Sequence, residues 1–331
     1  MDMGRTLVSP TDSHPSVGGA SVARTSRGFA EHLGLPYLPV VIESRGAAGA
    51  AAGPAPDVAS AVALGGSGLR LGYGRNTVVE DLSVVLPTGR VTALIGPNGS
   101  GKSTVLRALA RLHPLQSGRV DLDGDTDVAE LPSRVLATRL TLLSQSKVAP
   151  GGVTVGEVVA YGRYPHRSRW GGGDTDGAAV VARVLAMTGV QDLADRPVDQ
   201  LSGGQMQRVW LASCLAQDTA VLLLDEPTTF LDIRYQVELL DIIRDLADEH
   251  GITVGVVLHD LDQAAALADG IVLLDGGRVV AAGTPEDVLT AELLTRTYGI
   301  DIDVETDALT GSLRTRARGR HHRRRAVVVS T

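Results

Sequence analysis

The sequence predicts an α/β fold built on a largely parallel sheet. From about residue 66, short apolar runs alternate with amphipathic helical patterns, which is typical of such folds. Four runs indicate strands, and three of them are almost wholly apolar, as expected for strands that are covered on both faces. They are RVTALI at 90–95, AVLLLD at 220–225, TVGVVLH at 253–259 and IVLLD at 271–275.

Helices are expected between these strands. Residue spacing gives two of them an apolar face. These faces are Val105, Leu109 and Leu112 in one helix, and Tyr235, Leu239, Ile242 and Leu246 in a helix from about 234 to 249. Helical patterns also dominate from about 148 to 210, which predicts a separate helical lobe. No internal repeat is visible, so we expect a single domain of this type.

The two ends of the chain differ in composition from this core. Residues 1–64 are rich in Ser, Gly, Ala and Pro, which predicts a disordered extension or an over-extended start. The main domain is expected over 65–314. Residues 315–331 are expected to be a disordered, arginine-rich tail.

The charge balance bears on possible partners. The net charge is −7, and seven arginines lie between Arg314 and Arg325, so the rest of the chain carries −7 − 7 = −14. An acidic body argues against nucleic acid as the main partner. The arginines themselves are expected to be solvated, with contact to anionic lipid or nucleic acid as the alternative.

Cysteine content and hydropathy indicate a cytoplasmic protein. Cys214 is the single cysteine, so an internal disulfide is excluded and a reducing compartment is favoured. No apolar run approaches the ~18–20 residues that a membrane-spanning helix needs. The N-terminus lacks the pattern of a secretory signal. We therefore expect any membrane role to be exerted through a partner protein.

A phosphate-binding loop follows the first apolar strand. Residues 96–103 fit the pattern G-x-x-x-x-G-K-[ST], with a strand before them and an amphipathic helix after them. Small residues allow backbone N–H groups and the helix N-terminus to face the phosphates. We expect Lys102 to reach the β- and γ-phosphates and Ser103 to bind Mg²⁺. The candidate ATP-binding residues here are Gly96, Pro97, Asn98, Gly99, Ser100, Gly101, Lys102, Ser103 and Thr104.

Two acidic residues end the second apolar strand. Open α/β sheets bind ligands at the carboxyl ends of their strands, so Asp225 is expected to hold Mg²⁺. Glu226 follows at once and is the candidate base that polarises the attacking water. No N-K-x-D segment for reading guanine occurs, which favours ATP over GTP.

Further segments, in this order, resemble the nucleotide-binding domain of ATP-binding cassette (ABC) proteins. LSGGQ is similar to the family's signature and comprises Leu201, Ser202, Gly203, Gly204 and Gln205. The other resembling positions are Tyr73 in LGYGRN, Gln145 in LLSQ, Asp232 in TFLD and His259 in VLHD. The resemblance implies a RecA-like α/β core with a phosphate loop, an antiparallel β subdomain and an inserted helical lobe.

The resemblance also implies roles for these residues. Tyr73 would stack on adenine, Gln145 would contact Mg²⁺ and water, and His259 would touch the γ-phosphate. Asp232 would belong to the loop that crosses between subunits. The signature would bind the ATP held by a partner subunit, in a head-to-tail dimer. Ser202 fits an N-cap position, and the glycines of the signature fit an anion site, which agrees with binding of the partner's ATP.

Two longer stretches are similar to a narrower branch of the family. Residues 153–170 and 225–240 resemble importer ATPases for ferric siderophores, haem and vitamin B12, and Trp210 favours the siderophore members. In that branch the Tyr-Pro-His segment docks on membrane subunits. The alternative for Arg163, Tyr164, His166 and Trp170 is an ordinary exposed loop. His113, His166 and His259 lie in different elements and do not form a metal site. We therefore expect iron to be cargo of the complex and not to be bound by this chain.

The expected function is therefore ATP hydrolysis, with ATP and Mg²⁺, in a subunit of a siderophore importer. The expected assembly is a homodimer at the cytoplasmic face of the membrane, with two permease subunits and an external binding protein. Alternatives are a haem or vitamin B12 importer, an exporter subunit, or a non-transport ABC ATPase of repair or iron–sulfur assembly. The transported substrate contacts other polypeptides, so this sequence alone does not identify it.

Overall fold

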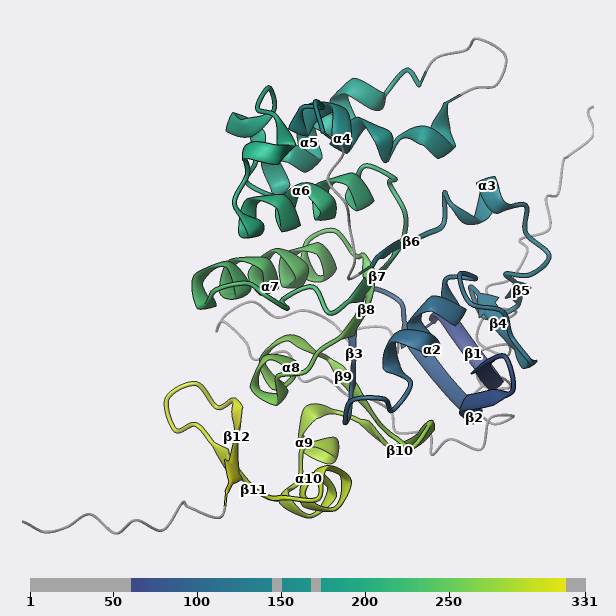
Figure 1. The fold of residues 1–331 in the computed structure, drawn as a ribbon, viewed down its shortest axis with the longest axis vertical. Coiled ribbons are helices and arrows are strands. Elements are labelled where there is room, and N and C mark those ends of the chain that lie inside the picture. Colours follow the sequence, from purple (N-terminus) through teal and green to yellow (C-terminus); the bar gives the residue numbers. More distant parts are fainter. Residues whose placement is uncertain (1–60, 145–150, 168–173, 320–331) are drawn as a thin grey trace, which may run out of the picture.

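The fold places one largely parallel sheet at the centre of the molecule (Figure 1). The structure is a computed structural model, and it describes residues 61–144, 151–167 and 174–319. Within these residues, six strands form the central sheet in the order β10-β9-β3-β8-β7-β6. Only the edge strand β10 pairs antiparallel. The strands are β3 (Val91–Ile95), β6 (Leu140–Leu143), β7 (Val221–Asp225), β8 (Thr253–Val257), β9 (Gly270–Asp275) and β10 (Arg278–Gly283).

Both faces of this sheet are covered, which explains its apolar strands. Along β7, Leu222 and Leu224 belong to one core cluster, and Val221 and Leu223 belong to the other. The first cluster includes residues of α7 (Ile233–Asp248) and α8 (Leu261–Leu267). The second includes residues of α2 (Lys102–Leu109). Alternate residues of one strand therefore fill two separate cores.

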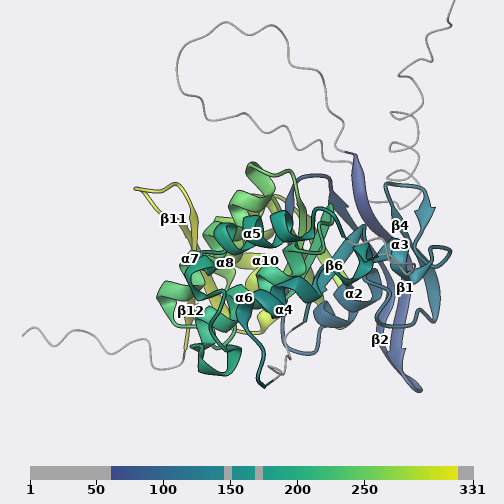
Figure 2. The same cartoon turned by 90° about the horizontal axis from the view of Figure 1, so that it is seen from above.

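An antiparallel sheet adds to the second core. Its order is β2-β1-β4-β5, and its strands are β1 (Val62–Tyr73), β2 (Asn76–Pro87), β4 (Ser117–Leu122) and β5 (Thr126–Asp127). Figure 2 shows this sheet on the side of the molecule where α2 lies. The short α3 (Ser133–Leu136) follows it.

A helical lobe is inserted between β6 and β7, at the top of Figure 1. Its three longest helices pack against one another, and α6 lies on the side of the lobe that faces α7 (Figure 1). The helices of the lobe are α4 (Val155–Tyr161), η1 (Tyr164–His166), α5 (Gly177–Met187), η2 (Gln191–Leu193), η3 (Val198–Gln200) and α6 (Gly203–Leu215). The predicted α/β fold with an antiparallel subdomain and a helical lobe is thus confirmed.

The C-terminal part forms two short helices and a hairpin. These are α9 (Pro285–Val288), α10 (Ala291–Tyr298), β11 (Asp301–Thr306) and β12 (Leu313–Arg318). In the pairing register, Asp301, Asp303 and Glu305 of β11 face Arg318, Arg316 and Arg314 of β12. Alternating arginines opposite alternating acids form a charged strand pair, which stabilises a hairpin.

Several boundaries differ from the sequence-based expectation. The tail was expected from residue 315, but 315–318 belong to β12, which pairs with β11 so that its arginines lie opposite acidic residues in the register. At the other end, β1 begins at Val62, inside the expected extension. The rest of that extension, 1–60, and the tail residues 320–331 lie outside the described residues.

Two helix faces also need correction. The first helix stops at Leu109, because the chain turns at Arg111, whose φ is 56°, and this leaves Leu112 exposed. On α7, Leu239 and Leu246 are buried as expected and Ile242 is half-buried against the same core, but the fully buried Ile243 was not among the expected positions.

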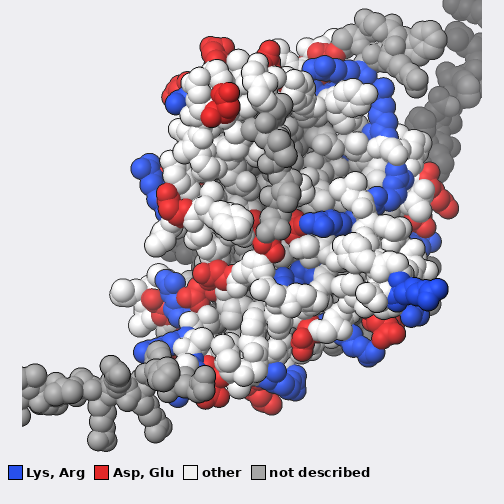
Figure 3. Space-filling view, in the orientation of Figure 1, with Lys and Arg blue, Asp and Glu red and all other residues white. Residues whose placement is uncertain are grey.

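Two further properties of the described residues concern membrane crossing and surface charge. None of the helices in residues 61–144, 151–167 and 174–319 combines the length and the apolar character that a membrane crossing requires. Figure 3 shows acidic and basic side chains spread over one face of the molecule, with basic ones most frequent towards its upper right edge.

Candidate functional site

The phosphate loop connects β3 to α2 by a turn that requires glycine. Gly96 and Gly101 have φ values of 142° and 99°, a region that residues with a side chain rarely adopt. A Cβ at Gly101 would lie 2.7 Å from Cγ2 of Val79, and one at Gly96 would collide with the carbonyl oxygen of Leu274. The loop therefore holds one defined conformation at the N-terminus of α2, where backbone N–H groups favour an anion.

Lys102 is buried and folded back onto its own loop. Its Nζ donates hydrogen bonds of 2.9 Å to the carbonyl oxygens of both Gly96 and Pro97. Burial lowers the pKa of Lys102 below its ordinary value of 10.5, while the negative charges of Glu226 and Asp225 act in the opposite direction. The loop lysine and the two acids at the end of β7 therefore share one electrostatic environment.

Asp225 offers a free oxygen at the carboxyl end of β7. Its side chain is fully buried, and its Oδ2 accepts a 3.0 Å hydrogen bond from Nη2 of Arg107. Within the described residues its Oδ1 has no hydrogen-bond partner. A buried carboxylate oxygen without a partner is costly in an apolar interior, and it is the type of ligand that Mg²⁺ prefers. Asp225 therefore fits the metal that the loop pattern implies.

Glu226 lies beside His259, the residue expected to touch the γ-phosphate. Its Oε1 is 2.6 Å from Nε2 of His259, and Oγ1 of Thr229 donates to its Oε2 at 3.3 Å. Glu226 has a φ of 53°, which is unfavourable for a residue with a side chain and directs the turn after β7. The fold thus brings together Lys102, Asp225, Glu226 and His259 from three separate segments.

The signature starts α6 with a capping box. Oγ of Ser202 accepts from the backbone N–H of Gln205, and Oε1 of Gln205 accepts from the backbone N–H of Ser202. Gly203 is exposed, and a Cβ there would meet nothing within 4 Å, whereas one at Gly204 would lie 2.6 Å from Cδ1 of Tyr235. The two glycines therefore differ: Gly203 leaves the helix N-terminus open, and Gly204 allows α6 to pack closely on α7.

The signature lies beside the loop that leads into α7. Asp232 caps α7 by accepting a 3.1 Å hydrogen bond from the N–H of Tyr235. Nε2 of Gln207 on α6 donates to the carbonyl oxygen of Pro227, which follows Glu226. Figure 1 shows α6 in the helical lobe, away from α2. The two candidate anion sites of one chain are therefore formed by different parts of the fold.

Tyr73 presents a free aromatic face at the end of β1. Its ring is exposed and lies 4.7 Å from the ring of His113, at an interplanar angle of 57°. His113 is buried, and its Nε2 lies 3.1 Å from the carbonyl oxygen of Gly72. The histidine thus supports one side of Tyr73, a role that no local sequence pattern indicates.

Three glutamines near the site were also missed. Gln263 contacts Oγ1 of Thr228 and Oε1 of Gln236, and Gln236 donates to the carbonyl oxygens of Thr228 and Leu231. Together with Gln207 they hold the segment between Glu226 and Asp232. Their partners are distant in sequence, so spacing alone could not identify them. Gln145 and Trp170, by contrast, lie outside the described residues.

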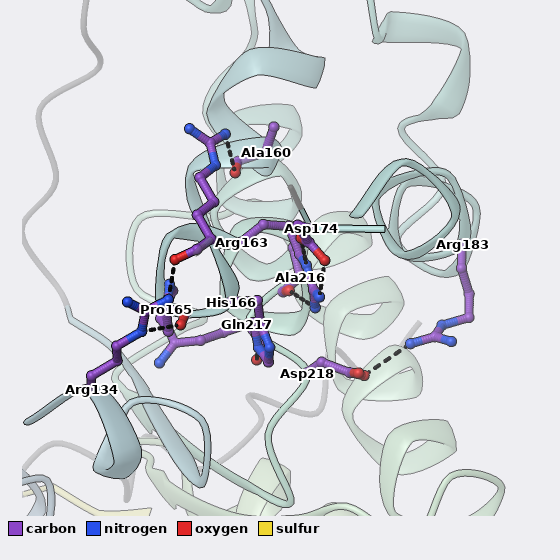
Figure 4. A network of polar contacts seen from close by, with 11 residues as sticks. Arg134, Ala160, Arg163, Pro165, His166, Asp174, Arg183, Ala216, Gln217 and Asp218 are labelled. Carbon is purple, nitrogen blue, oxygen red and sulfur yellow. Dashed lines mark hydrogen bonds and ion pairs between the residues drawn. The ribbon is translucent and has the colours of Figure 1, made fainter. Parts of the chain in front are cut away.

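The segment expected to dock on membrane subunits has mixed properties (Figure 4). Arg163 is buried and donates to both oxygens of Asp174, at 2.7 and 2.9 Å, and to the carbonyl oxygen of Ala216. Nε2 of His166 lies 2.7 Å from the carbonyl oxygen of Gln217. Tyr164 is 77% exposed. Arg163 and His166 therefore hold the lobe together, and Tyr164 remains available at the surface.

Comparison with known proteins agrees with this geometry. The family model described as "ABC transporter" matches residues 79–229. The chain is 46% identical over 256 residues to the ferric enterobactin transport ATP-binding protein of Escherichia coli (strain K12), which covers 76% of this chain and 93% of that protein. It is 41% identical to the iron(3+)-hydroxamate import ATP-binding protein of Bacillus subtilis (strain 168), over 73% of this chain and 90% of that protein.

A solved structure supports the same assignment. The structure of cbiO1 from Clostridium perfringens, part of the ABC transporter complex cbiONQ, matches with a TM-score of 0.63 and 26% identity, over 71% of this chain and 94% of that chain. The chain belongs to the ABC transporter family, as an ATP-binding subunit that hydrolyses ATP.

Proposed function

We propose that this chain is the ATPase subunit of an importer for ferric siderophores. The pairing of Glu226 with His259, next to the free oxygen of Asp225, carries the proposal for hydrolysis. The names of the two relatives support the siderophore, because one transports ferric enterobactin and the other imports iron(3+)-hydroxamate. Haem and vitamin B12 remain the competing cargoes.

The site residues divide the chemistry among them. Lys102 and the N–H groups of the phosphate loop bind the phosphates, and Tyr73 stacks on adenine. Asp225 and Ser103, with Gln145, would hold Mg²⁺, which would neutralise phosphate charge when bound. Glu226 accepts a proton from water while the water oxygen attacks the γ-phosphorus. The bond from that phosphorus to the bridging oxygen of ADP breaks in the same step. His259 holds the Glu226 carboxylate and reaches the γ-phosphate.

Dimerisation completes the site in this proposal. Ser202, Gly203 and the rest of the signature bind the γ-phosphate of the partner subunit's ATP. Exposed apolar residues beside Asp232 support an interface at this place, because Phe230 is 95% exposed and Ile233 is 80% exposed. The dimer works below two permease subunits at the cytoplasmic face of the membrane, and an external binding protein delivers the cargo.

A Glu226→Gln variant tests the hydrolytic part. We expect its ATP turnover to fall at least ~10²-fold while ATP still drives dimer formation, because the amide keeps the shape of the side chain but accepts a proton poorly. Phosphate release and size-exclusion chromatography measure the two properties. Glu130→Gln, at an exposed position, is the matched control. Near-normal turnover of the Glu226 variant would remove this residue from the role of base.

The cargo is tested separately by transport. We expect cells that lack this chain to lose uptake of ferric siderophore and to regain it with the wild type but not with Glu226→Gln. Uptake of vitamin B12 and haem is measured in the same cells. Loss of one of these in place of siderophore uptake would identify a different importer and leave the ATPase assignment unchanged.

A further inference from the structure

The first turn of α8 is a junction between three parts of the molecule. It begins directly after His259, and Asp260 caps it by accepting hydrogen bonds from the N–H groups of Asp262 and Gln263, at 2.8 and 3.0 Å. This cap orients the two residues that follow. The position of His259 therefore depends on how firmly the turn is held.

The C-terminal hairpin holds one side of this turn. Oδ1 of Asp262 accepts two hydrogen bonds from Thr315 of β12, one from its N–H at 2.7 Å and one from its Oγ1 at 2.8 Å. Nη1 of Arg314 lies 3.6 Å from the other oxygen of Asp262. Hydrogen bonds to a charged acceptor are stronger than neutral ones. The carboxylate of Asp262 thus ties β12 to the start of α8.

The opposite side of the turn is tied to the segment between Glu226 and Asp232. Gln263 accepts a hydrogen bond from Oγ1 of Thr228 at 3.0 Å and donates to Oε1 of Gln236 at 3.0 Å. Thr228 is two residues after Glu226, which itself contacts His259. A shift of the first turn of α8 would therefore alter both residues of the His259–Glu226 pair.

The hairpin also has an anchor that does not involve α8. The N–H of Ile302 donates to Oγ1 of Thr295 on α10 at 3.0 Å, and the side chain of Ile302 is buried. On the outer face of the hairpin, Arg318 pairs with Asp303. Breaking the contact with Asp262 should therefore leave the hairpin folded but release the first turn of α8.

We propose that Asp262 is a positioning residue, through which the hairpin β11–β12 holds His259 against Glu226. The inference rests on the proposed role of His259 in hydrolysis. The hairpin then acts as a remote support of the ATP site, although none of its residues belongs to the phosphate loop, the signature or the strand ends that form this site. Through Gln263 the same turn also steadies the segment that leads to Asp232.

Two variants of the full chain weaken the contact from opposite sides. Asp262→Ala deletes the acceptor, and Thr315→Val deletes the hydroxyl donor while it keeps the backbone N–H. Asp303→Ala is the matched control, because it breaks an ion pair of the same hairpin away from α8. Asp262→Asn keeps an oxygen that accepts from Thr315 but loses the negative charge, so its effects should be smaller than those of Asp262→Ala.

Hydrogen exchange measures the positioning itself. We expect protection of the amides of residues 261–264 to fall about tenfold in Asp262→Ala and less in Thr315→Val, with no change in Asp303→Ala. The turnover number should fall about fivefold in Asp262→Ala, with KM for ATP within about twofold of the wild type, because the phosphate loop is untouched. Unchanged exchange in both contact variants, or an equal loss in Asp303→Ala, would overturn the proposal.

A double variant separates this inference from the proposed function. If Asp262 acts through His259, adding Asp262→Ala to His259→Ala should not lower turnover further. An additional fivefold loss in that background would overturn the action through His259. If His259→Ala alone hydrolysed ATP at the wild-type rate, the proposed role of His259 would be wrong, and the exchange experiment would still decide whether the hairpin holds α8.

Discussion

Single residues in the helical lobe show how a motif that suggests binding can serve stability. Arg163 stands beside Tyr164 and His166 in a segment that resembles a docking loop, yet its guanidinium is buried and takes up both oxygens of Asp174. Hydrogen bonding from Arg163 holds the pKa of Asp174 below its ordinary value of 3.8. The same arginine donates to the carbonyl oxygen of Ala216, so it also ties its own segment to the end of α6.

We predict that Arg163→Met lowers the free energy of unfolding by about 2 kcal/mol at pH 7, because it leaves a largely buried carboxylate without its partner. A carboxyl group whose pKa is lowered in the folded state stabilises the protein at pH values above its unfolded-state pKa. This contribution is lost as the pH falls through the lowered folded-state pKa. The difference from the wild type should therefore shrink below about pH 4. Urea denaturation at several pH values measures it.

The matched control for this prediction lies in the same network (Figure 4). Arg183 pairs with Asp218 at 2.9 Å, but both side chains are about half exposed. Arg183→Met should therefore cost no more than about 0.5 kcal/mol. Equal losses in the two variants would contradict the assignment of Arg163 to a buried support.

Packing between elements explains the second glycine of the signature. The α6 backbone approaches α7 at Gly204 and Tyr235, and the guanidinium of Arg208 lies over the Tyr235 ring, 5.6 Å from its centroid. Arg208 also pairs with Glu238 on α7. These contacts fix α6, the signature helix, to α7, the helix that Asp232 caps. The helical lobe is therefore held against the segment that leads into α7.

Substitutions at the two glycines should separate packing from binding. Gly204→Ala forces α6 away from Tyr235, and we expect it to lower the free energy of unfolding by about 1–3 kcal/mol. Gly203→Ala meets open space and improves helix propensity, so it should leave stability unchanged or raise it by up to about 1 kcal/mol. If Gly203 faces the partner's ATP, this stable variant should still lose ATPase activity. Urea denaturation and phosphate release distinguish the two effects.

Local sequence patterns predicted the elements better than their ends. The four apolar runs correspond to β3, β7, β8 and β9. Strands that are buried on both faces form nearly continuous apolar runs, which are easy to recognise in a sequence. The end of α2 was not predicted, because the apolar spacing continues past Arg111 and does not show that this residue has a left-handed backbone conformation. The strand β12 was also missed, because a run of arginines resembles a solvated tail until the acids of β11 are placed opposite.

At the scale of the whole molecule, topology assembles the proposed ATP site. Parallel strands end at one edge, so residues that follow β3, β7 and β8 meet there although more than a hundred positions separate the first from the second. This rule made Lys102, Asp225 and Glu226 predictable as neighbours. It could not predict Arg107, Gln263 or the support from Thr315, because these contacts depend on how helices and the hairpin pack on the sheet.

The separation of the signature from the phosphate loop leads to a prediction for the assembly. If each ATP site combines Lys102 of one subunit with Ser202 of the other, Lys102→Ala and Ser202→Arg chains should each be inactive alone. In an equal mixture about half the dimers are mixed, and each has one intact site of two, so about a quarter of the wild-type rate should return. The matched control mixes Lys102→Ala with Glu226→Gln, whose altered residues serve the same nucleotide, and it should stay inactive. Phosphate release decides between the mixtures: activity in the first and not in the second requires sites that are shared across the dimer. Inactivity in both, with mixed dimers present, would contradict sites that work independently across the interface.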